Sequence, residues 1–136
     1  MYTVLVDGDD HNEPIADAAR SILDGHVVLD RKLAITGHFP SVDVLASISR
    51  VASRVNSAER TAIATTLRKV MAARQGAQDL IDVGAYRAGT NPLVDAAVEN
   101  NSAITAFLQQ RMNDQTPSEQ AWAQLTRLTR AFGAIA

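Results

Sequence analysis

The sequence predicts a mainly helical protein in which a short strand–helix–strand piece precedes an all-helical region. Alanine is abundant while aromatic residues make up only 4% of the chain, a balance that favours packed helices over a sheet sandwich. From residue 57 onward, apolar side chains recur at helical spacing. The length of 136 residues suffices for one hydrophobic core.

A capped helix is predicted between residues 13 and 25. Asn12 or Glu13 can cap its first turn, where Pro14 is well tolerated, and Gly25 supplies a left-handed stop. Its apolar positions are expected to share one packed face. They are Ile15, Ala18, Ala19, Ile22 and Leu23.

Two short strands flank this helix in the prediction. Thr3–Val6 and Val27–Leu29 are apolar, β-branched runs, and a turn at residues 7–10 closes the first. The order strand, helix, strand predicts a parallel crossover unit. Because two strands alone make a poor sheet, we expect neighbouring strands outside this sequence.

The segment that follows is only partly assignable. Residues 31–36 predict a short helix that ends at Gly37, and His38-Phe39-Pro40 breaks it. Residues 41–55 resist assignment because their apolar positions are mixed with several serines.

The pattern becomes helical throughout from Asn56, which places the expected boundary between a domain of residues 1–55 and one of residues 56–136. Ser57 is expected to cap a helix that ends near Gly76. Further helices are predicted over residues 79–85, from residue 94, over residues 103–112, and after a capping box at residues 116–119. The inward positions of the helix over residues 79–85 are expected to be Leu80, Ile81 and Val83. Trp122, Leu125, Leu128 and Phe132 mark the apolar face of the last.

Composition excludes several classes of protein. A net charge of −2 gives no electrostatic reason for binding nucleic acid or an anionic membrane. The absence of cysteine excludes disulfides and thiolate metal sites. No apolar run approaches the roughly 20 residues that span a bilayer, and no secretory signal precedes the first strand. A cytoplasmic protein is therefore expected.

Three separated segments carry a resemblance to a known family: GDDHNEPIADAARSILDGHVVLDR, GHFPSVDVLASISRV and DLIDVGAYRAGTNPLVDAAV. They resemble, in order and spacing, the C-terminal part of the flagellum-specific and type III secretion export ATPases, which are relatives of the F-type ATP synthase subunits. The similarity runs from Tyr2 to about Leu108 and follows the flagellar branch more closely.

The resemblance implies a remnant of a RecA-like domain followed by a helical bundle, in a parent enzyme that forms a homo-hexamer. The parent would hydrolyse ATP with magnesium and couple this to protein export. The Gly-rich phosphate loop and the magnesium-holding Asp of the family lie upstream, and no GxxxxGK[ST] occurs in this sequence. The chain alone is therefore expected neither to hydrolyse ATP nor to bind it tightly.

Arg50, in SISRV, is the candidate catalytic residue. It matches the family's arginine that reaches the γ-phosphate held by a neighbouring subunit. A guanidinium suits this role because its planar donors fit the oxygens of a transferring phosphoryl group. The alternative is a surface arginine or a structural ion pair.

Phe39 and Tyr86 are the candidate adenine-side residues. Phe39 stands where the family usually has Tyr, so stacking on adenine is retained while a hydroxyl contact is lost. Tyr86, in GAYRAG, lies in a family loop that approaches the adenine from the other side. The alternative for both residues is ordinary packing.

No metal site is expected. The acidic residues at positions 7–13 lack the spacing of a calcium loop and suit a solvated turn and a helix cap, and the three histidines lack zinc-ligand spacing.

Residues 57 onward would be the part that functions without ATP. The resemblance implies that this region binds export chaperones, their cargo and a stalk-like coiled-coil protein, and that the protein is at most peripheral to a membrane export gate. The alternative is a stand-alone helical adaptor without ATPase activity.

Overall fold

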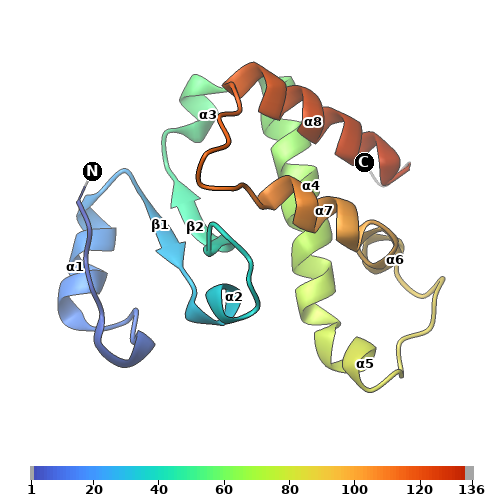
Figure 1. Cartoon of the computed structure of the whole chain (residues 1–136), viewed down its shortest axis with the longest axis horizontal. Coiled ribbons are helices and arrows are strands. Elements are labelled where there is room, and N and C mark those ends of the chain that lie inside the picture. Colours follow the sequence, from blue (N-terminus) through green and yellow to red (C-terminus); the bar gives the residue numbers. More distant parts are fainter. Residues whose placement is uncertain (1, 134–136) are drawn as a thin grey trace. The chain divides into compact units, whose positions relative to one another are not determined.

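The computed structural model describes residues 2–133 and divides into two compact units, Met1–Ala52 and Ser53–Ala136 (Figure 1). The prediction of a short sheet followed by a helical C-terminal domain is confirmed. Among the described residues, no helix is long and apolar enough to cross a membrane.

Unit 1 is a two-stranded hairpin with short helices around it. Its elements are the 3-10 turn Asp7–Asp9, α1 (Pro14–Ile22), β1 (Gly25–Leu29), α2 (Arg31–Ile35) and β2 (Val42–Ser49). The short helix predicted before Gly37 is confirmed as α2. The unassigned residues 41–55 contain β2 and the four-residue helix α3 (Ala52–Val55), which straddles the boundary between the units.

The predicted parallel pairing is wrong. β1 pairs with β2 and runs antiparallel to it, and residues 3–6 carry no strand. The crossover rule applies to strands that share a sheet. Within the described residues Thr3–Val6 has no strand beside it, so the rule joined two segments that do not pair.

The N-terminal cap of α1 is as predicted, but its C-terminal stop and its burial are not. Leu23 is the C-cap residue, and Gly25 is the first residue of β1 rather than a left-handed stop. The Glu13 carboxylate accepts a hydrogen bond from the Ala16 backbone N–H at 3.1 Å, and Pro14 opens the helix. Ile15 and Ile22 are 70% and 79% exposed, and Ala16 is the one hydrophobic residue described as buried in unit 1. The apolar face expected to be packed is therefore uncovered in this chain.

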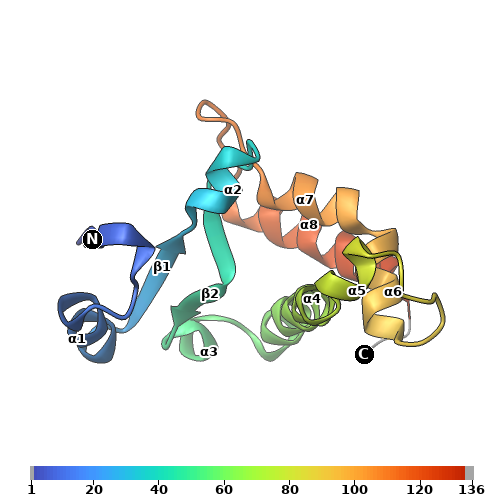
Figure 2. The same ribbon diagram turned by 90° about the horizontal axis from the view of Figure 1, so that it is seen from below.

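Unit 2 consists of helices. They are α4 (Ala58–Gly76), α5 (Gln78–Asp82), α6 (Pro92–Glu99), α7 (Asn101–Leu108) and α8 (Ser118–Ala131). Ser57 caps α4 as predicted, accepting a hydrogen bond from the Arg60 N–H at 3.2 Å. Both α6 and α8 pack against α4, and α7 packs against α6 and α8, an arrangement visible in Figures 1 and 2.

One hydrophobic core lies inside unit 2. Its buried members are Leu67, Val70, Ala96, Ala97, Ile104, Leu125, Leu128 and Phe132. The predicted apolar face of the last helix is confirmed, because three of its members are in this core and Trp122 packs against it.

Two helix predictions in unit 2 are wrong in detail. Leu80 and Val83 are 52% and 75% exposed, because α5 ends at Asp82 and is too short to bury a face. The capping box before α8 is absent: Pro117 is the N-cap residue and supplies no side-chain cap. The Glu119 carboxylate pairs instead with the Arg60 guanidinium.

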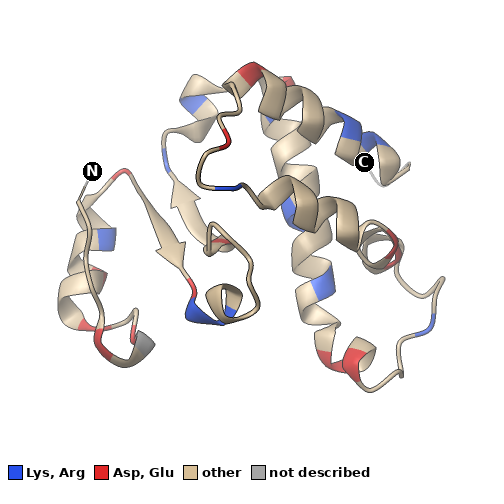
Figure 3. Ribbon diagram, viewed as in Figure 1, with Lys and Arg blue, Asp and Glu red and all other residues tan. Residues whose placement is uncertain are grey.

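Arg60 ties the first turn of α4 to the first turn of α8. Its guanidinium donates to the Glu119 carboxylate and lies 5.2 Å from the centre of the Trp122 ring. The pKa of Glu119 lies below its usual 4.5, first because of this hydrogen bond and second because of charge attraction to Arg60. Charges of both signs are interspersed along the ribbon in Figure 3.

The Arg60–Glu119 pair makes the stability of unit 2 acid-sensitive. A carboxyl with a lowered folded-state pKa stabilises the fold fully above its unfolded pKa, near 4.5, and this contribution is lost as pH falls through the folded pKa. Glu119→Gln is expected to lower the thermal midpoint at pH 7, and its difference from the parent should shrink as pH falls below 4.5. Glu59→Gln, an equal charge change on α4, is the control. A midpoint difference that stays constant between these pH values would contradict the assignment.

Candidate functional site

Arg50 follows the last residue of β2 directly, and its backbone is fixed at that point. The Arg50 N–H donates to the Asp24 carbonyl at 2.8 Å, and Gly25 faces Ser49 in the hairpin register. A Cβ on Gly25 would lie 2.6 Å from the Ile48 carbonyl oxygen. The hairpin can therefore close this tightly beside Arg50 only because residue 25 is glycine.

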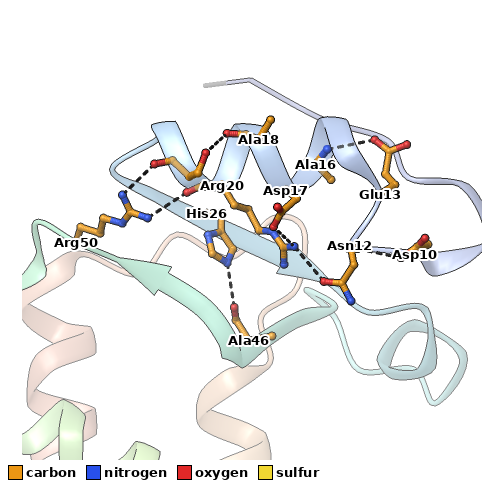
Figure 4. Close-up of polar contacts among 11 residues, drawn as sticks. Asp10, Asn12, Glu13, Ala16, Asp17, Ala18, Arg20, His26, Ala46 and Arg50 are labelled. Carbon is orange, nitrogen blue, oxygen red and sulfur yellow. Dashed lines mark hydrogen bonds and ion pairs between the residues drawn. The ribbon is translucent and has the colours of Figure 1, made fainter.

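The Arg50 guanidinium lies against the last turn of α1 (Figure 4). Its Nη1 donates to the Ser21 carbonyl at 3.3 Å and its Nη2 to the Arg20 carbonyl at 3.2 Å. The last carbonyls of a helix lack intrahelical partners and carry partial negative charge, so a cation there is stabilised. Arg50 is nevertheless exposed, and no carboxylate among the described residues pairs with it. The structural ion pair weighed as an alternative is absent there.

The α1 helix that supplies these carbonyls is itself tied together by polar contacts. The Arg20 guanidinium donates at 3.2 Å to Asp17 Oδ1 and at 3.2 Å to Asn12 Oδ1, joining the start of the helix to its last turn. Ser21 Oγ donates to the Ala18 carbonyl at 2.7 Å. The position of Arg50 thus depends on hydrogen bonds far more than on buried apolar surface.

A bulge in β2 explains why this segment was hard to assign from sequence. His26 pairs with Ile48 and Val28 with Asp43, so one residue of β1 faces four of β2. Asp43 Oδ1 accepts from the N–H groups of Leu45 and Ala46, at 2.9 Å each. The extra residues break the alternation of apolar and polar positions that marks a strand.

Phe39 lies in the loop before β2, at the opposite end of that strand from Arg50. Its side chain is 56% exposed. Within unit 1 the structure does not bring Phe39 and Arg50 together on one site.

Tyr86 belongs to unit 2, in the loop between α5 and α6. Its hydroxyl lies 2.9 Å from Asp95 Oδ1 and 3.1 Å from the Asn91 carbonyl oxygen. The other Asp95 oxygen accepts from the Gly89 N–H at 2.9 Å. Burial, followed by the hydrogen bond to Asp95, raises the pKa of the Tyr86 phenol above its usual 10.0.

A hollow of about 310 Å³ lies beside this loop, and the residues that line it include Leu80, Tyr86, Arg87 and Val94. Sequence reasoning missed Asp95, the residue that holds the loop; its signal was a lone acid in the first turn of an apolar helix. It also missed Gly25 as a close-packing position and Asp43 as the bulge anchor. Among the described residues, no group of three or more His, Asp or Glu side chains could hold a metal ion.

Comparisons with known proteins divide the chain in a similar way. Residues 56–127 match the family model of the T3SS EscN ATPase C-terminal domain. Residues 1–49 match that of the ATP synthase alpha/beta family, nucleotide-binding domain.

Individual relatives match nearly the whole chain. The flagellum-specific ATP synthase of Caulobacter vibrioides is 46% identical over 131 residues, which are 96% of this chain and 30% of that protein. The type 3 secretion system ATPase of Pseudomonas syringae pv. syringae is 44% identical over 129 residues, 95% of this chain and 29% of that protein. The solved structure of the assembled ATPase EscN from enteropathogenic E. coli superposes with a TM-score of 0.89 at 39% identity, covering 94% of this chain and 31% of that one.

The fold and the matched family models define a segment of the ATP synthase alpha/beta family nucleotide-binding domain followed by a helical domain of the EscN C-terminal type. The chain belongs to the family of the type III secretion and flagellum-specific ATPases, through its EscN-type C-terminal domain. It spans about 30% of the length of the curated relatives it matches.

The Asp43 anchor generates a stability prediction for the hairpin. Asp43→Ala leaves the N–H groups of Leu45 and Ala46 without their acceptor, at a cost of about 1–2 kcal/mol. Amide hydrogen exchange in β1 is therefore expected to rise by about 5–30-fold. Asp43→Asn, which keeps one oxygen acceptor, is the matched control and should change exchange much less. Equal exchange in the alanine variant and the parent would show that the carboxylate does not hold the bulge.

The Asp95 contacts generate a second prediction. Asp95→Ala removes the acceptor shared by Tyr86 and Gly89, so exchange of the Gly89 amide is expected to rise by about tenfold or more. Tyr86→Phe removes only the hydroxyl and should leave Gly89 largely protected. If both variants leave Gly89 exchange unchanged, Asp95 does not organise the loop.

Proposed function

We propose that this chain is the C-terminal part of a flagellar protein-export ATPase. Unit 1 would complete a nucleotide-binding domain and supply residues to ATP sites between subunits of a ring. Unit 2 would bind exported proteins, their chaperones and a stalk-like coiled-coil protein. Identities to relatives of the flagellar and virulence-secretion branches overlap, at 46% and 44% for the two described above. The DLIDVGAYRAG segment favours the export ATPases over a rotary-synthase subunit, and the choice of the flagellar branch is part of the proposal.

The observation that carries this proposal is the state of Arg50. Its side chain is exposed, has no acidic partner among the described residues, and lies at the end of a strand in the segment matched to the nucleotide-binding domain. An arginine kept only for stability would be expected to be buried or to pair with an acid. An exposed guanidinium with unused donors suits an anion supplied by another subunit.

The chemistry assigned to Arg50 is electrostatic. Charge spreads over the oxygens of the γ-phosphoryl group as the bond to the leaving phosphate breaks, and a guanidinium placed there stabilises that charge. Magnesium bound with ATP would neutralise charge from the other side. The chain contains no phosphate loop, so the nucleotide would be held by the upstream part of a neighbouring subunit.

Phe39 and Tyr86 are proposed to contribute to the adenine side of a site. The exposed ring of Phe39 offers a flat apolar face, and Tyr86 is uncharged and held by Asp95. Because Phe39 and Arg50 lie at opposite ends of β2, they would serve different nucleotides: Phe39 the one bound by its own subunit and Arg50 the one bound by the neighbour.

Unit 2 is proposed to bind export chaperones and a stalk-like coiled-coil protein, in the cytoplasm, with the ring being a homo-hexamer. One related structure is of the assembled ATPase EscN in complex with its central stalk EscO, at 38% identity and a TM-score of 0.81. The alternative, a stand-alone helical adaptor, is favoured only by the location of the described hydrophobic core in unit 2.

A chimeric enzyme tests the proposal. This chain would replace the corresponding segment of the full-length Bacillus subtilis flagellum-specific ATP synthase, to which it is 47% identical over 129 residues. Arg50→Ala is expected to lower the kcat for ATP by about 10³-fold or more while changing KM little, because the contact forms in the transition state. Arg50→Lys should recover only part of the rate. Unchanged kcat in Arg50→Ala would overturn the arginine assignment and leave the adaptor reading.

A further inference from the structure

We propose that the backbone of residues 20–25, which runs from the last turn of α1 to the first residue of β1, is a positioning element for the catalytic guanidinium of Arg50. This segment is called here the Arg50 cradle. Its assigned role rests on the proposed function and adds the structural element that orients the Arg50 side chain. Three of its carbonyls and one glycine fix Arg50, and each contact lies inside unit 1.

The cradle holds Arg50 at both ends of the residue. The Asp24 carbonyl accepts from the Arg50 backbone N–H at 2.8 Å, which fixes where the side chain leaves the hairpin. The carbonyls of Arg20 and Ser21 accept from the two terminal nitrogens at 3.2 and 3.3 Å, which fixes where it ends. An arginine side chain has four rotatable bonds between these points, and securing both ends removes most of that freedom before any substrate arrives.

The contacts to the helix orient the Arg50 side chain and leave some of its N–H donors without a partner among the described residues. A guanidinium has five N–H donors, and the two contacts to the helix employ two of them, which leaves three for an incoming anion. Backbone carbonyls are neutral dipoles, so they orient the cation without neutralising it as a carboxylate would. A carboxylate partner would instead compete with the phosphoryl oxygens for the same positive charge.

Gly25 makes the cradle sterically possible. Any Cβ at this position would lie 2.6 Å from the Ile48 carbonyl oxygen and 3.1 Å from the Ser49 Cα, so the end of β2 would have to move away from the α1–β1 turn. Both atoms belong to the backbone just before Arg50, and neither can rotate aside. The shift would pass directly to the Arg50 Cα while leaving its side chain chemically intact.

Nuclear magnetic resonance on the complete chain, labelled with ¹⁵N and ¹³C, tests the cradle without reference to activity. Scalar couplings across hydrogen bonds from the Arg50 Nη groups to the carbonyl carbons of Arg20 and Ser21 are expected, together with slowed rotation of the Nη groups. Arg87, whose guanidinium has no hydrogen-bond partner among the described residues, is the internal control. Free rotation of Arg50 equal to that of Arg87 would overturn the proposal.

The chimeric enzyme then separates positioning from chemistry. Gly25→Ala is expected to lower kcat by about 10–100-fold, as for an ångström-scale misplacement, with KM for ATP little changed and with Arg50 rotation released. Gly76→Ala, at a glycine with no atom within 4 Å of its added Cβ, should leave kcat within about twofold of the parent.

The two variants distinguish a failure of the cradle proposal from a failure of the proposed function. If Arg50→Ala is inactive while Gly25→Ala is fully active, the cradle is overturned and the proposed function stands. If Arg50→Ala is itself fully active, the proposed function fails, whatever the resonance spectra show. Should Gly25→Ala not fold, the couplings in the parent chain decide the question alone.

Discussion

The scarcity of buried apolar surface in unit 1 is the constraint on which the rest of its structure depends. Ala16 is the one hydrophobic residue described as buried in unit 1, while Leu5 and Ile22 are 90% and 79% exposed. Burial of apolar area is the main force that holds most domains together, and this chain, which spans about 30% of the length of its relatives, buries little apolar area within unit 1. Hydrogen bonds and the antiparallel pairing of β1 with β2 therefore determine where its side chains lie.

This constraint gives the contacts of Arg50 their importance. In a packed domain an arginine at a strand end could be placed by its apolar neighbours. In unit 1 it is placed by carbonyl groups of the nine-residue helix α1. Glu13 caps the first turn of this helix, and the Arg20 side chain donates a hydrogen bond to Asn12. Unit 2 shows the opposite case, since its helices share a continuous core and its polar contacts, such as Arg60 with Glu119, add to a fold that packing already defines.

The sequence predicted what local chemistry decides and failed where distant partners decide. The helix caps at Glu13 and Ser57 and the buried face of α8 followed from residue type and spacing. The strand pairing did not follow, because a strand pairs with whichever segment the fold places beside it, and residue type and spacing do not identify that segment. β2 was not recognised because its bulge interrupts the alternation of apolar and polar residues. The roles of Gly25 and Asp95 were not recognised because each depends on a backbone group that is not adjacent in sequence, the Ile48 carbonyl and the Gly89 N–H. Arg50, Phe39 and Tyr86 were singled out by resemblance, and their roles in a nucleotide site stay predictions.

The most direct test of the central claim is a mixing experiment with two inactive forms of the chimeric ATPase. One carries Arg50→Ala, and the other has an intact Arg50 and a disabled phosphate loop in the part contributed by the relative. If Arg50 acts on a nucleotide held by a neighbour, mixed rings contain interfaces at which both parts are intact, and ATP hydrolysis reappears. If mixed rings form and remain as inactive as the two parents, Arg50 does not act across the interface and the account given for it is wrong.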